Sequence, residues 1–168
     1  DPKNIKQHYA NAIAVADHGL KEFFDQLEER NELQNSLIFI CGDHSFPMGE
    51  HGVYRSESGA YEEFFRTPLM VWWGDRFRDE RRGGRAFTQM DIAPTILDWI
   101  GFPDAHPFQG NPISFHTENI SAVNSMQPIQ GSSHPGILFQ PYGGRWFVSV
   151  RYPMKYIYHA QSGWEGVF

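Results

Sequence analysis

The sequence predicts an α/β fold, because a long helical pattern is followed by a polar break and then by an apolar run of strand length. From Asn4 to about Glu29, apolar residues recur three and four positions apart, the spacing of one helix face: Ile5, Tyr9, Ala12, Ile13, Ala16, Leu20, Phe23, Phe24 and Leu27. Residues 36–41 are too few for a helix and contain five consecutive apolar residues. Such a run favours a central strand covered on both faces, as the strands of parallel sheets are.

Three further elements are expected before residue 102. A short helix is predicted around residues 61–65, where two consecutive glutamates place favourable negative charge at its N-terminus. Residues 67–73 are apolar and aromatic and predict a second strand. Residues 91–101 predict a helix, in which Asp91 is the N-cap, a proline lies in the first turn and a glycine ends the helix.

The last third of the chain predicts a small β-rich unit. Residues 102–135 lose periodicity and collect Pro, Asn, Ser, Gln and His, which is typical of a connector. Short stretches that predict antiparallel strands follow it: 137–139, 145–150 and 155–158. We therefore expect an α/β portion over residues 1–115, then a connector with a small antiparallel β unit over residues 116–168.

The composition is that of a folded globular protein, with 40% apolar and 15% aromatic residues among 168. A net charge of -6 gives no basic surface for a phosphate backbone, so no nucleic acid partner is expected. No run approaches the ~20 apolar residues of a membrane-spanning helix. The chain begins with Asp1 rather than Met, so we expect a piece of a longer protein. The single cysteine, Cys41, lies in an apolar run that predicts a buried, unreactive thiol.

Asp43 and His44 directly follow the predicted buried strand and a glycine. Open α/β sheets place their ligands beyond the carboxyl ends of their strands, so this position favours a functional role. A carboxylate oxygen and an imidazole nitrogen together suit zinc, manganese or a similar cation in a hydrolytic site. The alternative interpretation is that Asp43 caps a turn and His44 is an ordinary hydrogen-bonded polar residue.

The residues around this pair resemble the sulfatase family of the alkaline phosphatase superfamily in order and spacing. The resemblance rests first on residues 61–63, 66–69 and 89–97, and on the run Gly42-Asp43-His44-Ser45-Phe46-Pro47-Met48-Gly49-Glu50-His51-Gly52-Val53-Tyr54. Two later stretches, 108–111 and 151–157, are similar to the family's C-terminal segment. The implied fold is the C-terminal portion of an alkaline-phosphatase-like three-layer α/β/α sandwich, with the small antiparallel β unit after it.

The resemblance also implies a metal-dependent mechanism, in which an ion activates a hydroxyl nucleophile and neutralises charge on ester oxygens. Asp43 and His44 match the family's late metal ligands, and the ion would be a divalent cation such as Ca, Zn or Mn. The family's nucleophile and early ligands lie upstream of this region, and the chain contains no Cys-x-Pro-Ser-Arg motif. We therefore expect no catalytic residue in this chain, and no turnover without the upstream half of its own domain.

Three residues are candidates for contacting the substrate. Where the family has a lysine or a histidine against the ester anion, this sequence has Ser56 beside Arg55. The planar guanidinium of Arg55 recognises sulfate and phosphate oxygens well, and the alternative is an exposed loop arginine. His51 lies in a Gly-Glu-His-Gly turn and could touch the substrate, or could simply stabilise the turn.

The resulting hypothesis is a metal-dependent sulfuric ester hydrolase, present here without its nucleophile half. The first alternative is a phosphoglycerol or phosphoethanolamine transferase of the same superfamily. The second is a non-catalytic module that kept the scaffold. The expected partner is a small-molecule, glycan or lipid ester, and the resemblance implies an extracytoplasmic location.

Overall fold

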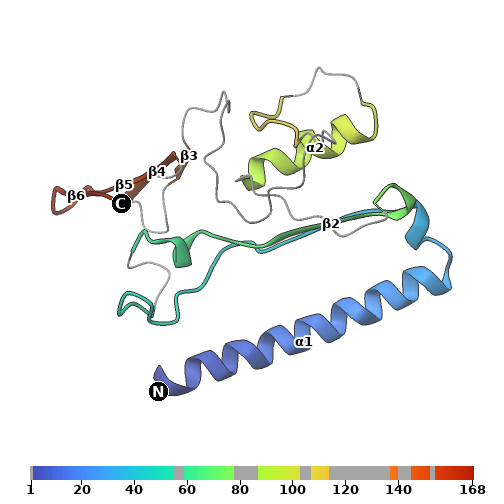
Figure 1. Cartoon of the computed structure of the whole chain (residues 1–168), viewed down its shortest axis with the longest axis horizontal. Helices are drawn as coiled ribbons and strands as arrows, with labels where there is room; N and C mark the ends of the chain where they lie inside the picture. Colours follow the sequence, from blue (N-terminus) through green and yellow to red (C-terminus); the bar gives the residue numbers. More distant parts are fainter. Residues whose placement is uncertain are drawn as a thin grey trace. The chain divides into compact units, whose positions relative to one another are not determined.

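The computed structural model describes residues 2–54, 59–77, 87–102, 107–113, 137–139, 145–151 and 154–168. The chain divides into two units, each described here by itself. The first contains residues 1–78, 138–150 and 154–168, and the second contains residues 79–137 and 151–153. Figure 1 shows the helices and strands along the chain.

The first unit begins with helix α1 (Pro2–Glu29), as the apolar spacing predicts. The helix ends because Asn31 adopts a left-handed backbone with a φ of 58°. The Asn31 amide then donates to the Glu28 carbonyl, and the Glu32 amide reaches back to the Leu27 carbonyl. These two bonds form a Schellman motif, and asparagine is one of the few residues that adopts this conformation readily.

The predicted strands exist, but their pairing differs from expectation. Strand β1 (Leu37–Cys41) pairs with β2 (Leu69–Trp73) in an antiparallel ladder that places Leu37 opposite Trp73 and Cys41 opposite Leu69. The expected parallel sheet is therefore wrong for this pair. The first four residues of β1 are half-buried, and the Cys41 thiol, predicted to be buried, is exposed. In the described residues the ladder has only these two strands, so each strand retains accessible surface.

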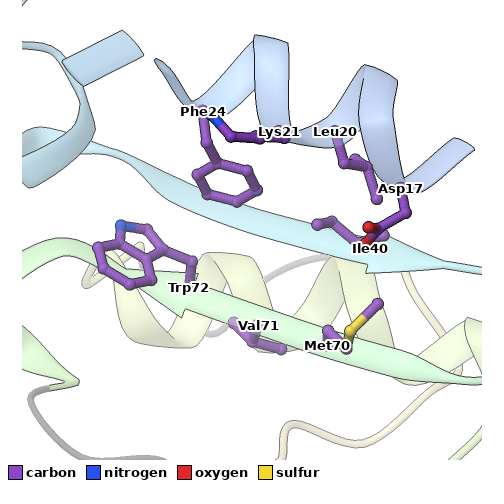
Figure 2. Close-up of a pocket in the computed structure, with 8 residues that line it drawn as sticks. All are labelled: Asp17, Leu20, Lys21, Phe24, Ile40, Met70, Val71 and Trp72. Carbon is purple, nitrogen blue, oxygen red and sulfur yellow. The ribbon is translucent and has the colours of Figure 1, made fainter.

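An apolar groove of about 380 Å³ lies between α1 and the β1–β2 ribbon, and Figure 2 shows the side chains that line it: Asp17, Leu20, Lys21, Phe24, Ile40, Met70, Val71 and Trp72. Phe24 points at Trp72, with the ring centroids 6.1 Å apart in an edge-to-face contact. The Trp72 indole nitrogen donates to the Leu33 carbonyl at 3.3 Å. Aromatic packing at one end of the groove thus holds the helix against the strands.

The four strands near the C-terminus form one sheet in the order β3-β4-β5-β6. They are β3 (Ile137–Phe139), β4 (Trp146–Arg151), β5 (Met154–His159) and β6 (Trp164–Val167). The three predicted strands are confirmed, whereas β6 was not predicted. Strand β6 pairs antiparallel with β5, placing Tyr156 opposite Val167. Val148, Val150 and Ile157 supply the buried side chains of this sheet.

The second unit is organised around the Asp91 carboxylate, which is 8% exposed. This residue precedes helix α2 (Ile92–Trp99), as predicted, but its side chain does not cap that helix. Its Oδ2 atom accepts hydrogen bonds from the amide of Thr88 at 2.8 Å and from the Thr88 hydroxyl at 3.0 Å. Its Oδ1 atom accepts from the amide of Asn111 at 2.9 Å. One carboxylate therefore joins the turn before the helix to a loop 20 residues later.

Replacing Asp91 by asparagine is expected to destabilise the second unit. The substitution turns one acceptor oxygen into an NH2 group, which then faces an N–H donor in a nearly buried site. The expected loss is about 1–3 kcal/mol of unfolding free energy, measured by urea denaturation. Asp98→Asn is the matched control, because this exposed aspartate lies on the same helix and loses the same charge. Equal stability of the two variants would contradict the role given to Asp91.

Candidate functional site

The end of strand β1 places the candidate metal ligands. The Gly42 amide donates to the Pro68 carbonyl at 3.2 Å, so the backbone pairing continues one residue beyond the strand. A Cβ atom at Gly42 would lie 3.1 Å from the Thr67 Cβ atom, which is closer than most packed carbons. Glycine therefore keeps the two chains together here, and Asp43 and His44 follow directly at the carboxyl end of the strand.

Both candidate ligands are exposed, with 91% of the Asp43 side chain and 64% of the His44 side chain accessible. The Asp43 Oδ1 atom accepts a hydrogen bond from the His44 amide at 2.9 Å. The His44 Nδ1 atom lies 2.9 Å from the Ser45 carbonyl oxygen. Because a carbonyl can only accept, Nδ1 carries the proton of the neutral imidazole and Nε2 carries the lone pair. A histidine ligand is commonly oriented in this way, by donating its other N–H to a backbone carbonyl.

The geometry of this pair fits a shared cation. The Nε2 atom of His44 lies 3.8 Å from Oδ2 of Asp43. Two ligands at about 2.0–2.6 Å from one ion lie up to about 4–5 Å apart, so both atoms can reach the same cation. Within the described ranges, no three His, Cys, Asp or Glu side chains gather as a metal cluster. The described residues thus offer two candidate ligands of the several that a divalent ion needs.

The loop after the ligands is shaped by its glycines. Gly49 has a φ of 98° and Gly52 a φ of 72°, conformations that other residues rarely adopt. The Gly52 amide donates to the Gly49 carbonyl at 3.1 Å, and the Gly49 amide donates to the Val53 carbonyl at 3.0 Å. The Tyr54 ring packs directly over Gly49, where a Cβ atom would lie 2.6 Å from it. These contacts close a tight turn around Glu50 and His51.

The Glu50 carboxylate stabilises the same turn. Its Oε2 atom accepts a hydrogen bond from the Met48 amide at 2.7 Å. This bond favours the ionised form and, together with a bond to the amide of Glu50 itself, holds the pKa of Glu50 below its usual range. Glu50 is therefore a turn-forming residue in the described structure.

His51, a candidate substrate contact, has two partners within the protein. Its ring stacks on Tyr61, with centroids 3.8 Å apart and planes 8° from parallel. Its Nδ1 atom lies 2.5 Å from Oε1 of Glu63, whose side chain is only 15% exposed. Both partners come from the short 3-10 turn around η2 (Glu62–Phe64), where a short helix was expected. Sequence reasoning assigned Glu63 to favourable charge at a helix N-terminus, and so missed its contact with His51.

The other two candidate substrate contacts, Arg55 and Ser56, lie outside the described residues. Their roles in binding the ester anion stay predictions.

The family model named Sulfatase matches residues 2–102, more than half of the chain. The chain belongs to the sulfatase family. Members of this family have an alkaline-phosphatase-like α/β fold and generally use a divalent metal ion. The resemblance of residues 42–54 and their neighbours to sulfatases is thereby confirmed.

Curated relatives include both sulfatases and phospho-group transferases. N-acetylglucosamine-6-O-sulfatase of Bacteroides thetaiotaomicron is 29% identical over 115 residues, which is 68% of this chain and 20% of that protein. The extracellular sulfatase SULF-1 homolog of Drosophila melanogaster is 27% identical over 101 residues, or 60% of this chain and 9% of that protein. Kdo(2)-lipid A phosphoethanolamine 7''-transferase of Escherichia coli is 29% identical over 86 residues, which is 49% of this chain and 14% of that protein.

The chain thus spans a fifth or less of the length of these three relatives. None of the described helices combines the length and the hydropathy that crossing a membrane requires.

Gly49→Ala is expected to disturb the turn around Glu50 and His51 through a clash with Tyr54. A positive φ strains alanine by about 1–3 kcal/mol at Gly49 and at Gly52 alike. Only Gly49 adds a steric overlap, because a Cβ atom at Gly52 meets no atom within 4 Å. Gly49→Ala should therefore lower the unfolding free energy more than Gly52→Ala.

A double-mutant cycle isolates the clash. In a Tyr54→Ala background, the two glycine substitutions should have the same effect on the unfolding free energy. If the difference between them persists without the Tyr54 ring, packing of that ring on Gly49 does not explain it.

Proposed function

We propose that this chain is the part of a metal-dependent sulfuric ester hydrolase that supplies Asp43 and His44 to the metal centre. The observation that carries the proposal is the orientation of His44. Its Nδ1 atom is bonded to the Ser45 carbonyl, and its Nε2 atom lies 3.8 Å from the Asp43 carboxylate. Membership of the sulfatase family and the position after strand β1 support the same role.

In this proposal the chain helps to bind the metal ion and the sulfate group, while the nucleophile comes from elsewhere in the protein. A divalent ion such as Ca, Zn or Mn would activate a hydroxyl nucleophile and neutralise charge on the ester oxygens. Asp43 and His44 would bind the ion from one side, and the remaining ligands would come from the upstream half of the domain. Arg55, Ser56 and His51 would contact the sulfate group. This chain alone is therefore expected to be inactive.

We propose that α1 and the β1–β2 ribbon are completed by the rest of an α/β/α sandwich. The exposure of apolar side chains such as Ile13, at 52%, supports this, because an apolar helix face is normally covered. We retain residues 1–115 and 116–168 as the proposed division. Relatives named as extracellular and as ulvan-active sulfatases support an extracytoplasmic location and a glycan or small-molecule ester as substrate.

A second candidate function is transfer of a phospho group. It is favoured by the similarity to phosphoethanolamine transferases of Escherichia coli and Salmonella typhimurium, which covers 49% of the chain in each case. A cation held by an Asp and a His serves phosphate esters as well as sulfate esters. Asp43 and His44 therefore do not distinguish the two functions. The third candidate is a non-catalytic module that kept the scaffold.

The proposed roles of Asp43 and His44 as metal ligands are tested by Asp43→Ala and His44→Ala in the full-length protein that carries this chain. Each substitution removes one direct ligand, so metal affinity measured by titration against a chelator should fall by at least about tenfold. Glu50→Gln is the matched control. It removes a carboxylate from the same loop, but that carboxylate is bonded to the Met48 amide and should not touch the ion.

Substrate assays with aryl sulfate and phosphate esters then separate the candidate functions. Metal-dependent hydrolysis of the sulfate ester that both alanine variants lose supports the sulfatase. Activity with phosphate esters alone would favour the transferase. Tight metal binding without turnover of either ester would favour the module, and metal affinity unchanged in both variants would show that Asp43 and His44 are not ligands.

A further inference from the structure

His51 is held more tightly than an ordinary loop histidine. The Tyr61 ring covers one face of the imidazole at 3.8 Å, which fixes the plane of the ring. The Glu63 carboxylate lies 2.5 Å from Nδ1, which fixes the rotation of the ring within that plane. These two contacts join His51 to residues 10 and 12 positions later and restrain the imidazole to one orientation.

The contact with Glu63 also determines which nitrogen of His51 is available for chemistry. A carboxylate accepts hydrogen bonds, so Nδ1 must carry a proton as its donor. Nε2 is then the nitrogen that is left to meet another group. The Glu63 side chain is 15% exposed, whereas that of His51 is 50% exposed. A mostly shielded carboxylate behind a half-exposed imidazole is the arrangement by which proteins orient a working histidine.

The support behind His51 continues into the C-terminal sheet. The Tyr61 ring meets the Phe168 ring edge to face, with centroids 6.1 Å apart. The Lys155 ammonium lies 5.6 Å from the centroid of each of these rings, so it binds their π faces as a cation. Among the described residues, the Glu63 carboxylate and the Lys155 ammonium contact this stack, and the Glu50 carboxylate interacts electrostatically with His51. The aromatic contacts connect the last residue of the chain to the turn that holds His51.

We propose that Glu63 is a positioning residue that sets the tautomer and the orientation of His51, so that Nε2 is presented to the substrate. The proposal rests on the proposed function, in which His51 contacts the ester substrate. It adds a residue that acts through His51 rather than on the substrate. With Nδ1 donating to Glu63, Nε2 can donate to an ester oxygen only in the imidazolium form, in which it carries a proton as well. A merely structural tie would need the same proton on Nδ1. Its loss would lower the unfolding free energy without a selective loss of kcat, and this difference makes the two roles separable.

The first test measures the tautomer and needs no activity. Long-range proton–nitrogen NMR of the histidine rings, recorded under alkaline conditions, should show His51 with its proton on Nδ1. Glu63→Gln should shift His51 toward the Nε2–H tautomer, because an amide no longer demands a donor at Nδ1. Glu62→Gln is the matched control. It removes the same charge from the adjacent residue, whose carboxylate pairs with Arg66 at 3.2 Å.

The second test uses the ester-cleaving activity of the full-length protein. Glu63→Gln should lower kcat about 10- to 100-fold with little change in KM or in metal content, the size of effect expected for a residue that orients a functional group. Glu62→Gln should leave both parameters unchanged. In a His51→Gln background, Glu63→Gln should have no further effect on kcat, because the group through which it acts is gone.

Several results would overturn the proposal. One is an unchanged tautomer in Glu63→Gln, and another is the same kinetic loss in Glu62→Gln. A further loss of kcat in the His51→Gln background would do so as well. If Glu63→Gln does not fold, Glu63→Asp keeps the charge but withdraws the carboxylate by one methylene, and it should still change the tautomer population. Failure of the sulfatase proposal would appear as absent ester hydrolysis in the wild type, while the NMR result for Glu63 would stand unchanged.

Discussion

The backbone pairing between strands β1 and β2 is the constraint on which the candidate site depends. The hydrogen bond from Gly42 to Pro68 extends this pairing past the last residue of β1. It fixes the point at which the chain leaves the ladder, and Asp43 and His44 are the next two residues. A side chain at position 42 would press on Thr67 and move that point. The position of two exposed polar groups is thus set by backbone contacts rather than by their own packing.

The loop after Asp43 and His44 is stabilised by hydrogen bonds within the loop and by contacts with the η2 turn. The glycine turn closes on its own backbone, Glu50 bonds the Met48 amide, and His51 is held by Tyr61 and Glu63. Each of these contacts restrains residues close to Asp43 and His44, and none of them involves the side chain of either residue. In the proposed function, such support would lower the entropy lost when an ion or an anion is bound, because the groups are already oriented.

Much of the fold follows from patterns that are local in the sequence. Apolar spacing predicts α1, and short apolar runs predict β1 and β2, since each depends on neighbours a few residues away. The antiparallel pairing and the exposed Cys41 were not predictable, because an apolar run does not reveal which strand lies beside it. For the same reason the sequence did not predict two contacts between distant residues. Asp91 bonds the amide of Asn111, 20 residues away, and Glu63 contacts His51, 12 residues away. Asp43 and His44, in contrast, were predicted from the family resemblance, because an Asp-His dipeptide alone carries little information.

The position of the bound ion would show directly whether Asp43 and His44 hold it. Crystals of the full-length protein that carries this chain, loaded with manganese, give an anomalous signal that locates the metal without reference to sequence. We expect a peak at about 2.0–2.6 Å from a carboxylate oxygen of Asp43 and from Nε2 of His44. A well-occupied manganese peak elsewhere, with both side chains bonded only to protein or solvent, would contradict it.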